Sequence, residues 1–131
     1  MPKHLLAALA VCAALAAAPP ARAGVSEDNF VLRSTADLVS LCGAAPADPL
    51  YTAAQNFCQG FAIGVYRVLA EEQAAEPRLR NFCMPDPTPS RNDAMAAFLQ
   101  WAQATPAAMT LPPADGVLDF LAARFPCPKG K

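Results

Sequence analysis

The side chains of this chain that could do chemistry are five cysteines, one histidine and a few neighbouring carboxylates. Cys12 lies in an apolar N-terminal run, whereas Cys42, Cys58, Cys83 and Cys127 are spread at wide, unequal spacings over the rest. There is no C-x-x-C pair, and the spacings are too wide for a zinc finger or ribbon. We therefore expect the four downstream cysteines to form structural disulfides rather than a metal site or a redox dithiol.

The remaining titratable groups argue against an enzyme. His4, the single histidine, lies in the N-terminal run, so the rest of the chain has no Ser–His or Cys–His pair and no histidine metal ligand. Two carboxylate pairs, Glu71–Glu72 and Asp115 with Asp119, fall on predicted helix surfaces, where a solvated polar face is the ordinary explanation. The sequence thus predicts a protein without catalytic activity, cofactor or metal.

Residues 1–23 have the three parts of a secretory signal peptide. Lys3 gives a basic start, residues 5–18 are almost wholly apolar, and Ala-Arg-Ala at 21–23 fits a cleavage site. The apolar run is shorter than the ~20 residues that span a bilayer. We expect cleavage after residue 23 and a soluble, exported domain of residues 24–131, located in the periplasm and without membrane contact.

Cys12 permits a competing interpretation, in which it is the lipid-modified cysteine of a lipoprotein. The residue before such a cysteine is normally small, and Val11 is not. The cleaved signal peptide is the interpretation that the sequence favours.

Charge excludes one further class of partner. The whole chain has a net charge of −1, and removal of the leader takes two basic residues with it, which leaves −3. The remaining basic residues form no cluster, so no nucleic-acid partner is expected.

Apolar residues recur at helical spacing in four segments, which predicts an all-α, four-helix, disulfide-stapled single domain. After an extended arm over 25–33, Ser34 and Asp37 resemble a capping box that starts the first helix. A long helix covers 50–75, Ser90 caps a third, and the last follows two prolines at 112–113. We expect residues 76–92 to be irregular.

The long helix carries one predicted buried stripe and two glycines. The stripe consists of Ala54, Phe57, Cys58, Phe61, Val65, Val68 and Leu69. Gly60 and Gly64 lie one turn apart, and each costs ~1 kcal/mol in a helix interior relative to alanine. We interpret them as places where a neighbouring segment approaches closely.

Four cysteines allow three pairings. Cys42 ends the first helix and Cys58 lies early in the second, so a tight helical hairpin favours Cys42–Cys58 together with Cys83–Cys127. The crossed arrangement, Cys42–Cys127 with Cys58–Cys83, is the main competitor.

Several motifs in a fixed order resemble the resistance-associated/type VI amidase immunity (Rap/Tai) family. They are Asp37-Leu38-Val39-Ser40-Leu41-Cys42, Phe57-Cys58-Gln59-Gly60-Phe61-Ala62-Ile63-Gly64, Phe82-Cys83-Met84-Pro85, Leu111-Pro112 and Phe125-Pro126-Cys127. The resemblance covers nearly all of residues 24–131. The chain departs from the family pattern at Phe61, where tyrosine is usual, and in the prolines between 85 and 89.

The resemblance implies a small helical periplasmic protein that neutralises a peptidoglycan amidase effector delivered by type VI secretion. Such proteins often form homodimers and inhibit by occluding the cleft of the toxin. A periplasmic stress or chaperone-like helical protein without a cognate toxin is the alternative, because a shared scaffold does not transfer function.

An inhibitor of this kind needs a rigid projection, and the proline-rich stretch 76–92 is the natural candidate because Cys83 tethers it. Arg78, Arg80, Met84 and Asp86 are its predicted partner-binding residues, since arginine and methionine are common at interface cores. An ordinary surface connection is the alternative explanation of this stretch.

Overall fold

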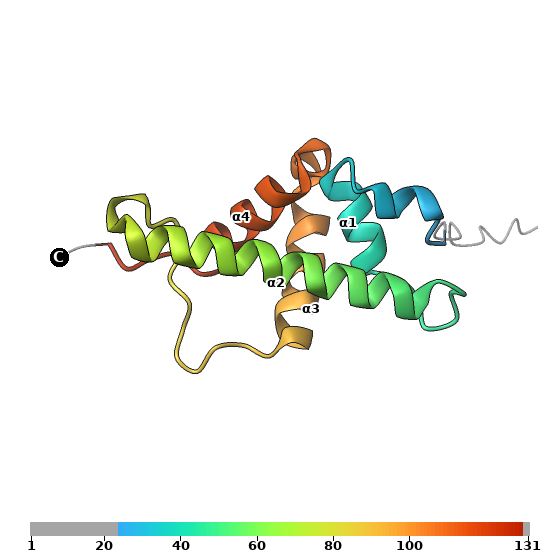
Figure 1. Ribbon diagram of the computed structural model, residues 1–131, viewed down its shortest axis with the longest axis horizontal. Helices are drawn as coiled ribbons and strands as arrows, with labels where there is room; N and C mark the ends of the chain where they lie inside the picture. The colour runs from blue at the N-terminus through green and yellow to red at the C-terminus, as the bar shows by residue number, and fades with distance from the viewer. Residues whose placement is uncertain (1–23, 130–131) are drawn as a thin grey trace, which may run out of the picture.

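The computed structural model describes residues 24–129, which are helical and contain no strand. In chain order the elements are η1 (Glu27–Val31), α1 (Thr35–Cys42), α2 (Tyr51–Ala75), η2 (Pro77–Leu79), α3 (Arg91–Ala104), η3 (Pro106–Thr110) and α4 (Pro113–Arg124). The predicted all-α, four-helix class is confirmed (Figure 1). The predicted signal peptide, residues 1–23, lies outside the described residues. No helix between residues 24 and 129 combines the length and apolar character needed to cross a membrane.

The start of α1 is fixed by hydrogen bonds to one carboxylate. Ser34 and Asp37 form the predicted capping box. Asn29 Nδ2 donates to Asp37 Oδ1 at 3.0 Å, and the backbone N–H of Arg33 donates to Asp37 Oδ2 at 2.9 Å. The bond from Asn29, followed by those from Arg33 and Ser34, lowers the pKa of Asp37 against an opposing effect of burial. Asp37 therefore ties the N-terminal segment to the first helix.

The N-terminal segment is not the extended arm that the sequence suggested. It contains the short helix η1, which Ser26 and Asn29 cap reciprocally, and the backbone N–H of Ser26 donates to Asn29 Oδ1 at 2.9 Å. These local hydrogen bonds stabilise the short helix relative to the extended conformation. The single turn η2 also forms, within the stretch that was predicted to be irregular, and η3 connects α3 to α4.

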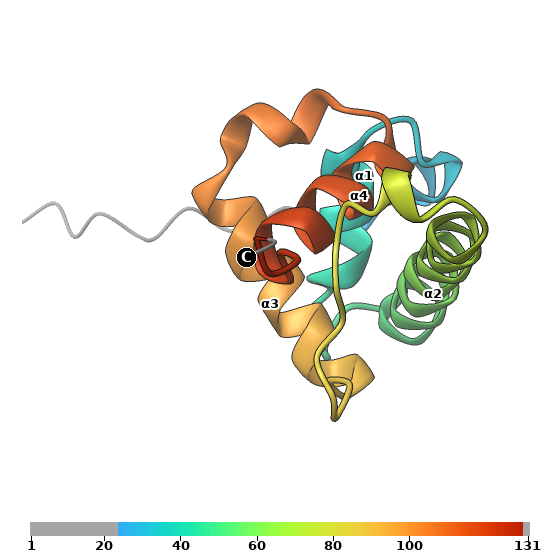
Figure 2. The same ribbon diagram turned by 90° about the vertical axis from the view of Figure 1, so that its left-hand side faces the viewer.

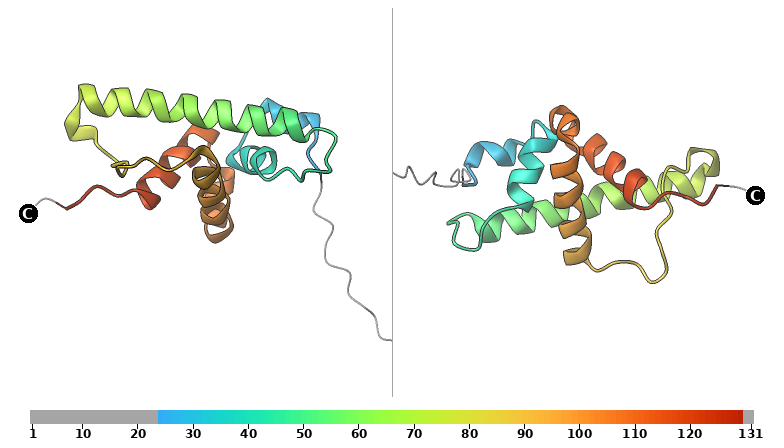
Figure 3. Two further views of the ribbon diagram at one scale, coloured as in Figure 1. Left: turned by 90° about the horizontal axis from the view of Figure 1, so that it is seen from below. Right: turned by 180° about the vertical axis from the view of Figure 1, so that it is seen from behind.

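Helix α2 lies along one edge of the molecule, and α1, α3 and α4 all lie on one side of it (Figure 3). Ala54 and Cys58 are accordingly buried, whereas Phe57 is 37% exposed and Val68 is 56% exposed. The prediction that Phe57 and Val68 belong to the buried stripe is wrong. The sequence period identifies residues that share a helix face, but only one side of α2 has helices to pack against.

The interpretation of Gly60 and Gly64 is also wrong. A Cβ atom placed on either glycine would meet no other atom within 4 Å. Both glycines therefore lie on the open side of α2, and no segment of the described chain approaches them.

The core is built around α1 and α4, which lie between α2 and α3 (Figure 2). Leu38 and Leu41 of α1 are fully buried, and Phe120 of α4 packs edge-on against Phe98 of α3 with ring centroids 5.4 Å apart. Trp101 is half-buried beside this pair. Burial of these side chains supplies most of the stabilisation available to a domain of this size.

One close contact joins α1 to α4. Thr35 is fully buried, and its Oγ1 donates to the carbonyl oxygen of Leu111 at 3.0 Å. A Cβ atom on Gly116 would overlap Oγ1 and Cγ2 of Thr35. Gly116 is thus the position where the absence of a side chain lets two elements approach closely.

The two disulfides join Cys42 to Cys58 and Cys83 to Cys127. This is the pairing favoured from the sequence, and the crossed arrangement does not occur. The first bridge links α1 to α2, and the second links the segment after η2 to the chain end beyond α4.

Candidate functional site

The segment between α2 and α3, residues 76–90, carries the four residues predicted to contact a partner. Arg78 and Arg80 lie in and just after η2, at the C-terminal end of α2, and both are exposed. Asp86 is exposed further along the segment, whereas Met84 is half-buried and packs against the core. The structure therefore leaves three of these side chains open to solvent and directs the fourth inward.

The first half of the segment is held firmly to the rest of the molecule. Gln73 Oε1 accepts hydrogen bonds from the backbone N–H groups of Asn81 at 2.7 Å and Phe82 at 3.1 Å. The N–H of Cys83 donates to the carbonyl oxygen of Phe125 at 2.7 Å, beside the disulfide to Cys127. These anchors fix the position of η2 and its arginines relative to α2 and α4.

Arg78 makes the only salt bridge in the described part of the chain. Its Nε lies 2.8 Å from Glu76 Oε1, and its side chain is 88% exposed. Such an exposed pair contributes little to stability. The guanidinium group of Arg78 is consequently available to a carboxylate on a partner.

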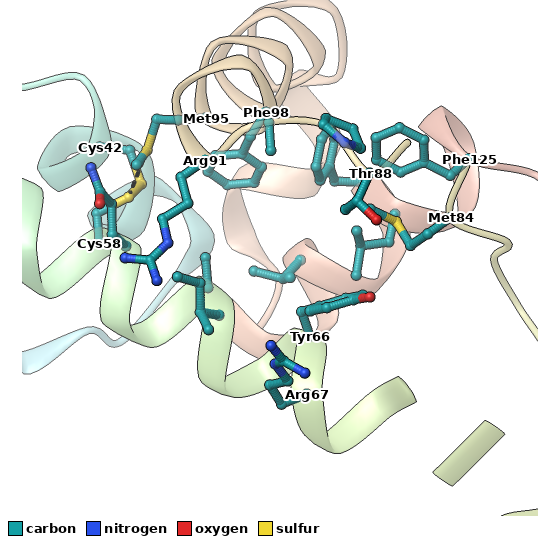
Figure 4. A pocket seen from close by; sticks show the side chains of 18 residues that line it. Cys42, Cys58, Tyr66, Arg67, Met84, Thr88, Arg91, Met95, Phe98 and Phe125 are labelled. Carbon is teal, nitrogen blue, oxygen red and sulfur yellow. Dashed lines mark hydrogen bonds between the residues drawn. A yellow bond between two sulfur atoms is a disulfide. The ribbon is translucent and has the colours of Figure 1, made fainter. Parts of the chain in front are cut away.

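A cavity of about 210 Å³ lies between α2, α3, α4 and the second half of the segment. Its wall is almost wholly apolar and includes Ile63, Met84, Met95, Phe98, Phe120 and Leu121. Figure 4 shows these and the other lining side chains surrounding a hollow, with the Cys42–Cys58 disulfide and Met95 at one end and Phe125 at the other. Met84, a predicted partner-binding residue, is part of this wall.

The cavity was not predicted from the sequence, although the sequence contains a pattern that indicates it. Gln59, Ala62, Ile63, Tyr66 and Arg67 follow the i, i+3, i+4, i+7, i+8 pattern of one helix face and line the cavity from α2. This stripe lies beside the predicted buried stripe of α2.

The carboxylate pairs show no arrangement for catalysis. Glu71, Glu72, Asp115 and Asp119 are all exposed on helix surfaces, as predicted. Residues 24–129 also contain no group of three side chains that could hold a metal ion.

The family model of the Rap1a immunity proteins matches residues 34–127, which is more than half of the chain. The chain belongs to the Rap1a immunity protein family. The match begins at Ser34, the N-cap of α1, and ends at Cys127, so it includes all four α-helices and both disulfides. The resemblance inferred from the motifs is confirmed. No curated protein and no solved structure gives a significant match.

Rap1a immunity proteins are inhibitors of secreted effectors and catalyse no reaction themselves. The prediction that this chain is not an enzyme is confirmed by its membership of this family. Its functional surface must therefore be one that binds another protein, and exposed segments tied to the disulfide framework are the natural places to look for it.

Proposed function

We propose that this Rap1a family protein acts in the periplasm, where it neutralises a peptidoglycan amidase effector delivered by type VI secretion. The signal-peptide pattern of residues 1–23 supports export, and the two disulfides fit an oxidising compartment. The amidase as target follows from the resemblance of the motifs to the Rap/Tai proteins.

The segment 76–90 is the proposed inhibitory element. The observation that carries this proposal is the combination of firm anchoring at Gln73 and Cys83 with the nearly complete exposure of the Arg78 side chain. An anchored segment loses little conformational entropy on binding, so more of the contact energy appears as affinity. Arg78 and Arg80 would pair with carboxylates at the rim of the amidase cleft, and Asp86 would contact the same partner further along.

The test is inhibition of the cognate amidase by purified protein, with peptidoglycan hydrolysis as the readout. We expect the double variant Arg78→Ala/Arg80→Ala to weaken inhibition by at least tenfold, because interface arginines are common hot spots. Arg33→Ala is the matched control, since Arg33 is an exposed arginine outside the segment. Equal inhibition by wild type and the double variant would remove the segment from the proposal.

The same preparation separates an inhibitor from a chaperone-like protein. A pull-down from periplasm should recover one enzyme at ~1:1 if the protein is an inhibitor. Recovery of many unfolded clients, with no amidase among them, would favour the stress-protein alternative.

We further infer that the open side of α2 is the contact face of a homodimer, which the family resemblance implies. Val68 exposes apolar surface there, and Phe57, whose ring packs against Phe30 of η1 with centroids 5.5 Å apart, is 37% exposed. Gly60 and Gly64 between them leave room for a second helix to approach.

A further inference from the structure

The first residues of the exported domain are attached to the loop between α1 and α2. The backbone N–H of Val25 donates to Asp48 Oδ2 at 2.8 Å, across 23 positions of sequence. The N–H of Leu50, the N-cap of α2, donates to Asp48 Oδ1 at 2.8 Å. Figure 3 shows the N-terminal segment and this loop at the same end of α2. One half-buried carboxylate therefore joins the start of the domain to the start of its longest helix.

Gly24 leaves an empty position against this carboxylate. A Cβ atom built on Gly24 would lie 3.0 Å from Asp48 Oδ2. The Cβ position and the backbone nitrogen are both tetrahedral positions around Cα, so a rotation of about 120° about the Cα–C bond brings the nitrogen to the Cβ position. A glycine at a chain end permits this rotation because it has neither a side chain nor a preceding residue. The nitrogen is then at salt-bridge distance from Asp48.

Cleavage after residue 23, which the proposed function includes, creates a charge at this nitrogen. Hydrolysis of the peptide bond takes up one water, leaves a carboxylate on Ala23 and frees the amino group of Gly24. An α-amino group has a pKa of ~7.7–8.0, so most of it is protonated at neutral pH. In the uncut chain the same nitrogen is a neutral amide and forms no ion pair.

We propose that Asp48 binds the α-ammonium group of Gly24 in the processed protein, so that removal of the leader fastens the N-terminal segment to the start of α2. The proposal rests on the cleavage in the proposed function, but not on the identity of the effector. Further along the segment, Phe30 of η1 packs against Phe57 of α2 with ring centroids 5.5 Å apart. The ion pair would therefore help to hold η1 beside the open side of α2.

Asp48 is a better partner for this ammonium group than the other carboxylates near the chain start. Glu27 and Asp28 are exposed in the first turn of η1. An exposed carboxylate gains little from an ion pair, because its side chain must give up conformational freedom to form it. The Asp48 carboxylate is already fixed by two backbone hydrogen bonds, so pairing with it restricts only the ammonium group.

The first experiment uses the full-length protein, exported with its own leader and purified from the periplasm. Intact-mass spectrometry identifies the first residue, which we expect to be Gly24. The rate of α-amino acetylation at neutral pH then reports the fraction of uncharged amine. We expect Asp48 to raise the α-amino pKa by about 0.5 unit, so Asp48→Asn should react about threefold faster than the wild type. The matched controls, Asp28→Asn and Glu27→Gln, should each alter the rate by less than about 1.5-fold.

The second experiment leaves the sequence unchanged and alters the charge of the amino group. Acetylation of the Gly24 amine removes the charge, whereas reductive dimethylation keeps it. The Leu50 amide is a suitable reporter, because it donates to the other oxygen of Asp48 and lies far from the chain end in sequence. Hydrogen exchange at Leu50 should be about twofold faster in the acetylated protein and unchanged in the dimethylated protein.

Three results would overturn the proposal. The first is a processed chain that begins at a residue other than Gly24, which would also count against the cleavage in the proposed function. The second is an acetylation rate of Asp48→Asn equal to that of the wild type, or an equal increase in Asp28→Asn or Glu27→Gln. The third is equal exchange at Leu50 in the acetylated and dimethylated proteins. The last two results would refute only the ion pair and leave inhibition of the amidase untouched.

Discussion

Replacement of Gly116 by alanine tests the packing of α1 against α4. The added Cβ would overlap the Thr35 side chain, which is fully buried and held by hydrogen bonds from Oγ1 to the carbonyl oxygens of Leu111 at 3.0 Å and Pro112 at 3.3 Å. The overlap can be relieved only if the helices move apart or the threonine side chain rotates. Both responses disturb the centre of the core.

The magnitude follows from these two costs. Overpacking a core by one methyl group costs ~1–3 kcal/mol, and leaving the buried Thr35 hydroxyl without its acceptor costs a further ~1–3 kcal/mol. Alanine recovers ~1 kcal/mol of helix propensity. The first two costs do not add in full, because movement of the Thr35 side chain relieves the overlap while it breaks the hydrogen bond. We therefore expect Gly116→Ala to lower the free energy of unfolding by about 3 kcal/mol.

The assay is equilibrium unfolding in urea with both disulfides intact, and the matched controls are Gly60→Ala and Gly64→Ala. In the monomer the new Cβ at these two positions meets open space, so each control, measured on the monomer at low protein concentration, should raise the free energy of unfolding by about 0.5–1 kcal/mol. Combining Gly116→Ala with Thr35→Ala removes the overlapping atoms, and the double variant should be at least 1 kcal/mol more stable than the sum of the single effects. If Gly116→Ala proved as stable as the two controls, or if the cycle showed no coupling, the packing argument would fail.

Three further predictions concern stability and assembly. Folding lowers the pKa of Asp37, so the stability that the Asp37 carboxylate contributes is complete above the unfolded-state pKa of ~3.9 and is lost as the pH falls through the lower folded-state pKa. Asp37→Asn should therefore be less stable than the wild type at pH 7 and should lose less stability below pH 4, as measured by acid titrations followed by circular dichroism. Cys83→Ala/Cys127→Ala opens a loop with a sequence separation of 44 and should lower the free energy of unfolding in urea by ~4 kcal/mol. Removal of the Cys42–Cys58 bridge, with a separation of 16, should lower it by ~3 kcal/mol. A cost for the longer loop that is equal to or smaller than that for the shorter one would contradict the chain-entropy argument. If the open side of α2 is a dimer contact, Val68→Glu should give a monomer by light scattering coupled to gel filtration, while Ala74→Glu, an exposed position of α2 about 120° away around the helix, should not.

Local structure could be predicted from the sequence wherever neighbouring residues determine it. The capping box of Ser34 and Asp37, the cap of Ser90 and the extent of α2 are all as expected, because hydrogen bonds between residues three apart start helices and apolar periodicity continues them. The favoured cysteine pairing is also confirmed.

The candidate site was only partly predictable. Arg78 and Arg80 are exposed, and their role in partner binding stays a prediction. The inward position of Met84 and the cavity beside it depend on where α3 and α4 lie. Residues far apart in sequence, such as Ile63 and Phe98, share one cavity wall. No local pattern contains that information.

By itself the sequence determined the helices, their caps, the cysteines that staple them and the motifs of the Rap1a immunity family. Only the tertiary structure decided which side of α2 is buried and which glycine cannot carry a side chain without a steric clash. Gly60, Gly64 and Gly116 all occupy helix interiors, yet only Gly116 faces a neighbouring element. The physical reason is that helical periodicity shows which residues share a face, whereas the packing of distant elements decides what that face meets.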